Sequence, residues 1–119
     1  MIDIKADIEK NILLLRLEGF LTDDALKSGV DLCIAEAKKL SSGYFIINDI
    51  SRMKPASPAG AAEIKRAQSY VINNGVGKII RVTRNPITKI QLNRTSIEVG
   101  YEAFEVRSLE EAYQLIEKG

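Results

Sequence analysis

Residues 44–47 are apolar at every position, and this run constrains the fold more than any other part of the chain. A strand with one face in water alternates apolar and polar residues, whereas an uninterrupted apolar run is typical of a central strand covered on both faces. Asn48 and Asp49 follow the run, and Ser57 and Pro58 then have the order of an N-cap and a first helical residue. The chain is therefore predicted to form an open α/β sheet, with its working surface where this strand ends and the next helix begins.

The other elements are predicted from hydrophobic periodicity and capping residues. Apolar and polar residues alternate over residues 2–8, as in a half-buried strand, and apolar residues recur at steps of three and four after Asp23, as on one face of a helix. The pattern predicts strands at 2–8, 12–18, 44–49, 78–83 and 104–106, and helices at 23–40, 58–73, 87–100 and 109–116, with a turn at 84–86 and a cap at Ser108. The inner face of the second helix is expected to consist of Ala61, Ala62, Ile64, Ala67, Val71 and Ile72, and that of the third helix of Ile87, Ile90 and Ile97.

The order of these elements predicts a single α/β domain over residues 1–119. Strands separated by single helices are joined by right-handed parallel crossovers, whereas the first two strands, which a short turn connects, form an antiparallel hairpin. The expected architecture is one mixed, mostly parallel sheet with about four helices, in the order β-β-α-β-α-β-α-β-α. A chain of 119 residues can bury one hydrophobic core without a metal ion or a disulfide.

Composition excludes several kinds of site. The chain has no histidine, which excludes catalytic triads and zinc sites that use this residue, and we expect neither a metal ion nor a cofactor. The single cysteine, Cys33, lies among apolar residues and is interpreted as a small buried hydrophobe. The longest apolar run, residues 12–15, is far shorter than the roughly 18–20 residues that cross a bilayer, and the start of the chain lacks the pattern of a signal peptide. We therefore expect a cytoplasmic protein without a membrane span.

The charges are unevenly distributed, although the net charge is only +1. Residues 50–97 contain nine basic residues and Glu63 as their only acidic residue, whereas the segments on either side are acidic. Such asymmetry either builds a face of one sign that attracts an anionic ligand or an acidic protein, or disperses over solvated surfaces once the chain folds. Apart from Tyr70, no aromatic residue lies within the basic segment, so nucleic-acid binding is not expected.

The element order and two segments of the sequence resemble the STAS domain family, which is named for sulfate transporters and anti-sigma-factor antagonists. In that family a strand commonly ends in an aspartate flanked by hydrophobic residues, as residues 45–51 do here around Asp49. Residues 100–112 resemble the end of the family's domain, and the resemblance covers nearly the whole chain. It implies a STAS-like fold and a non-enzymatic role, in which the face around the second helix docks on a regulatory protein, often a protein kinase of a sigma-factor switch.

The resemblance also implies a phosphoacceptor at the start of the second helix, where phosphorylation breaks the contact with the partner. The family's acceptor lies in a motif of aspartate, serine or threonine, a small residue and glycine. Residues 57–60 are Ser-Pro-Ala-Gly, so alignment on Gly60 puts Ser57 at the aspartate and Pro58 at the acceptor, and the chain departs from the standard motif. Ser57 is therefore either a phosphoacceptor at the positive end of a helix or a structural N-cap.

Two hypotheses for function follow. In the first, a regulatory protein, such as a kinase-type anti-sigma factor, docks on helix 58–73 and the loop before it. The docking residues of this hypothesis are Arg66, Ser69 and Tyr70. In the second, an anionic small molecule binds at the N-terminus of the same helix, provided that the strands at 44–49 and 78–83 are neighbours. The ligating residues of the second hypothesis are Arg52, Lys54, Ser57 and Arg84.

Catalysis is not expected, because the chain contains neither a Gly-rich phosphate loop nor a nucleophile elbow. Asp49 at the end of the buried strand is either a base or cation ligand, or a structural hydrogen-bonding residue. No second carboxylate lies near it in the sequence, which favours the structural interpretation. The sequence does not predict the oligomeric state.

Overall fold

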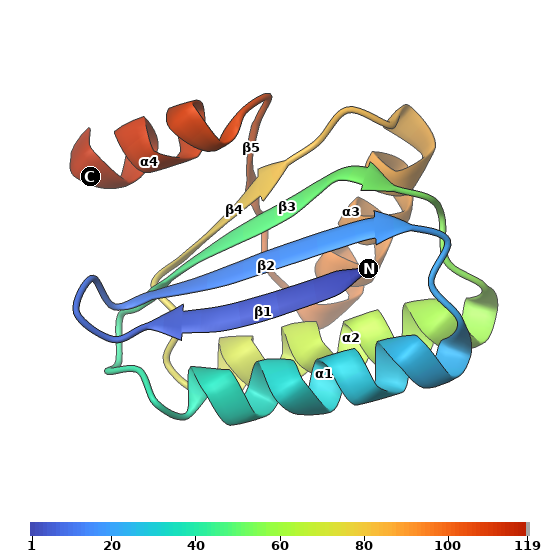
Figure 1. Cartoon of the computed structure of the whole chain (residues 1–119), viewed down its shortest axis with the longest axis horizontal. Coiled ribbons are helices and arrows are strands. Elements are labelled where there is room, and N and C mark those ends of the chain that lie inside the picture. The colour runs from blue at the N-terminus through green and yellow to red at the C-terminus, as the bar shows by residue number, and fades with distance from the viewer. Residues whose placement is uncertain (119) are drawn as a thin grey trace.

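The computed structural model describes residues 1–118, and its elements follow the predicted order (Figure 1). The strands are β1 (Ile2–Asp7), β2 (Ile12–Gly19), β3 (Phe45–Met53), β4 (Lys78–Val82) and β5 (Phe104–Val106). The helices are α1 (Asp23–Ala37), α2 (Pro58–Asn73), α3 (Pro86–Val99) and α4 (Leu109–Lys118). The largest difference from the predicted strand boundaries is at β3, which continues to Met53.

The five strands form one mixed sheet in the order β1-β2-β3-β4-β5. β1 and β2 form the predicted antiparallel hairpin, and every other neighbouring pair is parallel. β4 pairs with β3, with Asp49 opposite Val82, so the condition on which the anion-binding hypothesis depends is met. The mixed α/β architecture predicted from the sequence is thus the observed one.

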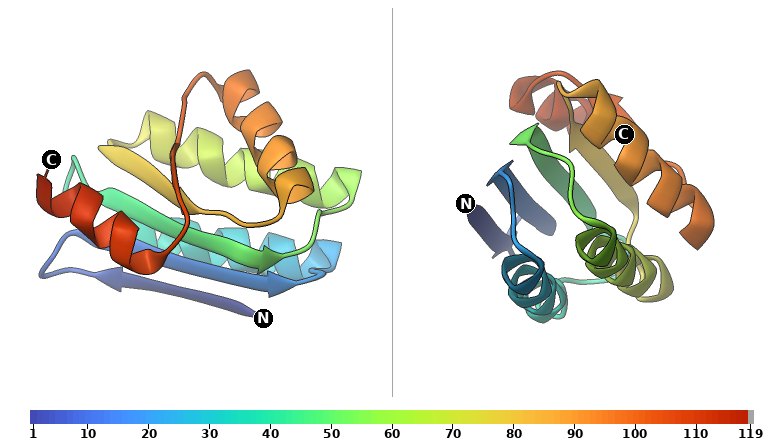
Figure 2. Two further views of the ribbon diagram at one scale, coloured as in Figure 1. Left: turned by 90° about the horizontal axis from the view of Figure 1, so that it is seen from above. Right: turned by 90° about the vertical axis from the view of Figure 1, so that its right-hand side faces the viewer.

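Helices cover both faces of the sheet, but unequally. α1, α2 and α3 lie on one face, and α4 lies on the other (Figures 1 and 2). Side chains of β3 are buried on both faces, since Ile46 contributes to the core under α1 and α2, whereas Ile47 packs with Ala112 of α4. β3 is therefore the covered central strand that its apolar sequence predicts.

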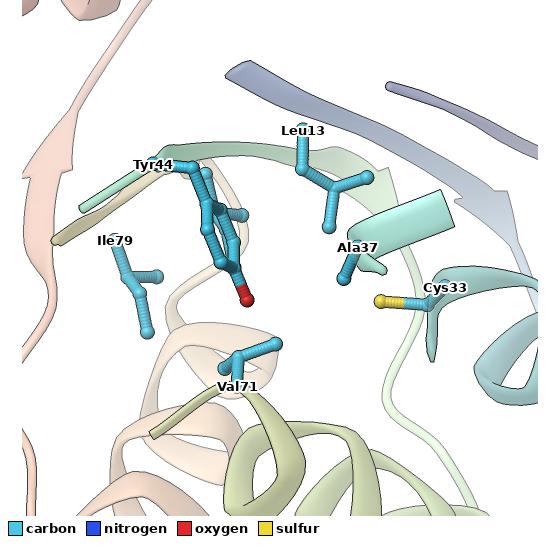
Figure 3. Packing of buried hydrophobic residues seen from close by; sticks show 7 residues of the cluster. Leu13, Cys33, Ala37, Tyr44, Val71 and Ile79 are labelled. Atoms are coloured by element: carbon cyan, nitrogen blue, oxygen red, sulfur yellow. The ribbon is translucent and has the colours of Figure 1, made fainter. Parts of the chain in front are cut away.

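The core between the sheet, α1 and α2 is shown in Figure 3. Its labelled members are Leu13, Cys33, Ala37, Tyr44, Val71 and Ile79. Burial raises the pKa of the Cys33 thiol to about 11, so this side chain stays a neutral thiol at neutral pH, as its interpretation as a buried hydrophobe requires. The Tyr44 ring points into the same cluster, and burial raises the pKa of its hydroxyl to about 12.

The predicted inner face of α3 is wrong. Ile87, Ile90 and Ile97 face the solvent, with exposed fractions of 66%, 57% and 74%. The buried residues of α3 are Thr88, Leu92, Thr95 and Ser96. Burial of the Thr88, Thr95 and Ser96 hydroxyls costs little free energy, because each donates a hydrogen bond to a backbone carbonyl. Two of these carbonyls belong to α3 itself.

Two details of β3 and α2 also differ from the prediction. Arg52 belongs to β3 and not to the loop that follows it. On α2, Ala62 is exposed although it was expected inside, and Gln68 is buried although it was not. Both residues belong to a helix whose inward stripe is Gly60, Ile64, Gln68 and Val71.

Part of the positive charge of the basic middle of the chain is paired or buried in the fold. Three of its cations pair with carboxylates from the acidic flanking segments, and a fourth, Arg81, is buried in β4. The pairs are Lys65–Glu98 at 2.9 Å, Arg66–Asp31 at 2.9 Å and Lys89–Glu105 at 2.8 Å. The uneven distribution of charge along the sequence is thus partly balanced in space. Within residues 1–118, the other five cations of this segment form no ion pair: Arg52, Lys54, Lys78, Arg84 and Arg94.

Candidate functional site

Ser57 is the N-cap of α2. Its side-chain oxygen accepts a hydrogen bond from the backbone N–H of Gly60 at 3.0 Å, and its hydroxyl donates to a carboxylate oxygen of Asp23 at the start of α1. Pro58 occupies the first helical position, where its missing N–H costs nothing. Ser57 therefore fixes the start of α2 and links it to the start of α1.

Removing this cap gives a first prediction. We expect Ser57→Ala to lower the free energy of unfolding by about 1–2 kcal/mol, because the N–H of Gly60 loses its acceptor and α2 loses its link to Asp23. Asp23→Asn keeps the cap and is expected to cost about 0.5 kcal/mol. Urea unfolding of both variants measures the two losses, and a larger loss for Asp23→Asn would contradict the role of Ser57 as the main cap.

The four residues of the anion-binding hypothesis do not all line one hollow. Arg52 and Lys54 are exposed at the end of β3 and just after it. Arg84 comes shortly after β4, and β4 pairs with β3 only as far as Asp49. Because β3 continues for four more residues to Met53, Arg84 does not lie beside the end of β3. Arg84 instead lines a hollow of about 600 Å³ at the N-terminus of α3, together with Lys89 and Arg107, and neither Arg52, Lys54 nor Ser57 lines this hollow.

The three predicted docking residues of α2 lie in different environments. Arg66 is held against α1, because it pairs with Asp31 and donates a hydrogen bond to the backbone carbonyl of Lys27 at 3.4 Å. Tyr70 packs against the core between the sheet, α1 and α2, and Ser69 is half-buried. The exposed residues of α2 are Pro58, Ala59, Ala62, Lys65 and Asn73.

An apolar surface whose residues were predicted to be buried lies next to α2. It consists of Ile87, Ile90 and Ile97, which share one face of α3, with exposed Arg94 between them; we call it the α3 stripe. The ion pair Lys65–Glu98 joins the exposed sides of α2 and α3, so the two helices present neighbouring surfaces. Both the buried residues of α3 and its three exposed isoleucines recur at helical spacing. The isoleucines are the more apolar set, so a prediction from apolar periodicity places the wrong face inside.

Asp49 has a structural role in this geometry. Its carboxylate accepts hydrogen bonds from the Ser51 hydroxyl at 2.6 Å and from the Ser51 backbone N–H at 3.1 Å. Within residues 1–118, no three acidic or cysteine side chains gather closely enough to hold a metal ion. These hydrogen bonds agree with the structural interpretation of Asp49.

No helix in the described part of the chain combines the length and the apolar character needed to cross a membrane. No protein-family model matches the sequence, and no match is found among the curated proteins. The solved structure of the anti-sigma factor antagonist SpoIIAA in its unphosphorylated form is similar to this chain. The similarity covers 100% of this chain and 99% of SpoIIAA, with a TM-score of 0.59 and 15% sequence identity, and it shows a shared fold.

Proposed function

We propose that this chain is a non-enzymatic regulatory module that binds another protein through α2, the loop before it and the adjoining α3 stripe. The observation that carries the proposal is the solvent exposure of Ile87, Ile90 and Ile97 on one helix face beside α2. Its second support is the fold, which the chain shares over its full length with an anti-sigma factor antagonist. The proposed partner is a regulatory protein of the kinase-type anti-sigma-factor class.

The α3 stripe has the character of a docking surface. Three large aliphatic side chains in one exposed row are unusual for a helix of a monomer, whereas apolar patches with a polar rim mark protein interfaces. Their cluster differs from the scattered exposed hydrophobic residues elsewhere in the chain, which need no explanation. Arg94 lies within the stripe and Lys54 near the start of α2, so the complementary partner surface is apolar with acidic groups at its edge.

The surface of α2 complements this stripe. Ala59 and Ala62 are small and exposed, so a partner backbone can approach the helix closely there. Lys65 and Arg66 flank these alanines, but each pairs with a neighbouring helix, which leaves the alanines as the accessible part. We therefore expect docking to depend on the α3 stripe and on the small residues of α2 more than on Arg66 or Tyr70.

Ser57 gives this surface a means of control. A phosphate on Ser57 adds about −1.5 to −2 charges at the edge of the α2 surface and next to the Asp23 carboxylate. It also replaces the hydroxyl that donates to Asp23, so the link between α1 and α2 is lost. We propose that phosphorylation of Ser57 weakens docking, because it adds negative charge and removes the hydrogen bond to Asp23.

Binding of an anionic small molecule at the start of α2 is the weaker proposal. The Asp23 carboxylate already takes the hydrogen bond of Ser57 and places a negative charge beside the helix end. An anion bound at the start of α2 would be repelled by the Asp23 carboxylate, and this repulsion offsets the attraction of the helix dipole for the anion. The geometry at Ser57 therefore favours protein docking over an anionic ligand.

The docking proposal is tested by replacing one isoleucine of the stripe. The chain is used to capture partners from extract of its own cells, and native mass spectrometry identifies the complex. We expect Ile90→Glu to weaken the complex about thirtyfold or more, because loss of a hot-spot contact at the centre of an interface costs about 2 kcal/mol or more. Ile90 is exposed in the free chain, so its thermal unfolding is expected to change little.

Leu32→Glu is the matched control, since Leu32 is an exposed apolar residue on α1, outside the proposed surface. The partner should bind the control and the unchanged chain equally well. A complex that survives Ile90→Glu, or one that is lost equally in Leu32→Glu, would overturn the proposed docking surface.

A further inference from the structure

A cavity of about 80 Å³ lies between the sheet and the helices on the α1–α3 face. Leu15, Ile46 and Ile79 line it from the sheet, and Val30, Cys33 and Val71 line it from α1 and α2. Figure 3 shows Cys33, Val71 and Ile79 around the Tyr44 ring in the same buried cluster. The walls of the cavity are thus mostly aliphatic.

Two amide side chains interrupt the apolar wall. Gln68 of α2 is 7% exposed and Asn48 of β3 is half-buried, and both line the cavity. The side-chain oxygens Gln68 Oε1 and Asn48 Oδ1 are fully shielded from solvent and have no hydrogen-bond partner within the chain. A buried polar atom without a partner typically costs about 1–3 kcal/mol, so these two oxygens call for a donor from outside the chain.

A third polar group lies at the same cavity. Tyr101 lines it, and its hydroxyl oxygen accepts a hydrogen bond from Arg81 Nη2 at 3.1 Å. Burial raises the pKa of the Tyr101 hydroxyl, which therefore keeps its proton at neutral pH. The Gln68 amide also forms a hydrogen bond with this hydroxyl, which leaves Gln68 Oε1 and Asn48 Oδ1 as the acceptors without a donor. The cavity thus combines aliphatic walls with two unpaired acceptors and a fixed hydroxyl, the arrangement of a small-molecule site.

We propose that this cavity binds a small apolar molecule that carries one hydrogen-bond donor, which Gln68 and Asn48 accept. The inference does not depend on the proposed docking surface, because the lining of the cavity includes neither the α3 stripe nor Ser57. Its volume is about half that of an apolar cavity of ~150 Å³ that binds benzene. The ligand class is therefore a five-membered heterocycle or a short alcohol.

Ordered water is the competing occupant. A polar cavity of this size holds a few water molecules, which would also supply donors to the two oxygens. The mostly aliphatic walls offer water few other partners, whereas a small apolar ligand gains from contact with them. The experiment therefore has to separate a ligand with a donor, an apolar ligand without one, and water alone.

Pyrrole and furan form a suitable pair of probes, because they have nearly the same size and only pyrrole carries an N–H donor. Each is titrated into the isotope-labelled full chain without a partner, and NMR follows the residues that line the cavity. We expect saturable shifts at Val30, Ile46 and Ile79, with pyrrole binding about five- to tenfold more tightly than furan. Failure of pyrrole to saturate would mean that the cavity holds water only, and equal affinity for furan would exclude a role for the two oxygens; either result overturns the proposal.

Three variants complete the test. Gln68→Met keeps the length of the side chain but removes one acceptor, and is expected to reduce the preference for pyrrole to about twofold. Gln114→Met, on the exposed side of α4, is the matched control and should leave the preference unchanged. Ala67→Leu fills the cavity from α2 and should abolish binding of both probes. Binding that persists in Ala67→Leu would overturn the assignment, and this readout does not require Gln68→Met to fold.

Discussion

Arg81→Ala is expected to lower the free energy of unfolding by about 3–5 kcal/mol. Arg81 is 1% exposed, and its guanidinium donates hydrogen bonds to Asn93 Oδ1 at 2.8 Å and to the Tyr101 hydroxyl at 3.1 Å. Alanine leaves a void in the core and deprives both oxygens of a donor. A domain of this size is typically stabilised by about 5–15 kcal/mol, so the loss is a large share of the total.

Arg81→Met separates the packing of the side chain from its charge. Among residues 1–118, no carboxylate lies within ion-pairing distance of Arg81, so the charge is buried with only neutral partners and the face of the Tyr101 ring. Methionine fills most of the same volume without the cost of burying a charge, and we expect a loss of about 1 kcal/mol. Urea unfolding measures both variants, and equal losses would show that the hydrogen bonds, rather than the packing, decide the stability at this position.

The contacts of Arg81 also determine where α3 lies. Asn93 belongs to α3, and the helix makes two further side-chain links to the end of β3 and the loop after it: Thr88 donates to the carbonyl of Met53, and Gln91 exchanges two hydrogen bonds with the backbone of Ala56. These bonds fix the rotation of α3 about its axis. The same rotation turns the α3 stripe toward the solvent, so the proposed docking surface depends on polar contacts beneath it.

Much of the fold could be predicted because its strongest signals are local. The covered strand at residues 44–47, the N-cap at Ser57 and the start of α1 at Asp23 depend on neighbouring residues and on a single burial pattern. Their positions relative to one another follow from the right-handed crossover rule. These features require no knowledge of which side chains meet across the core.

The proposed docking surface could not be predicted in the same way. Thr88, Thr95 and Ser96 can be buried at little cost in free energy only because their hydroxyls donate to backbone carbonyls. The carbonyl that accepts from Thr88 belongs to Met53, 35 residues earlier in the chain. Likewise, Arg81 was counted among the surface charges, because the Asn93 and Tyr101 side chains that permit its burial lie later in the chain. Apolar periodicity ignores such long-range partners, and it therefore assigned the α3 stripe to the core.

Gly77→Ala is expected to lower the free energy of unfolding by about 3 kcal/mol. A Cβ atom at Gly77 would lie 2.5 Å from the backbone oxygen of Gly43 and 3.2 Å from that of Tyr44. Neither oxygen can move freely, because Gly77 N donates to Tyr44 O at 2.7 Å and Gly43 N donates to Gly75 O at 2.7 Å. Relief of the clash therefore separates the two segments that lead into β3 and β4.

Gly43→Ala is the control for this prediction, because the same two segments meet there without a steric conflict. Gly43 has a φ of +87°, but a Cβ atom at this residue would meet nothing within 4 Å. Its substitution should cost only the strain of a left-handed conformation, about 1–2 kcal/mol. Urea unfolding of the two variants gives the difference directly. If Gly77→Ala lowered the free energy of unfolding no more than Gly43→Ala does, the close backbone approach at Gly77 would be contradicted. The hydrogen bonds of that approach, which hold the starts of β3 and β4 in register, would then be contradicted as well.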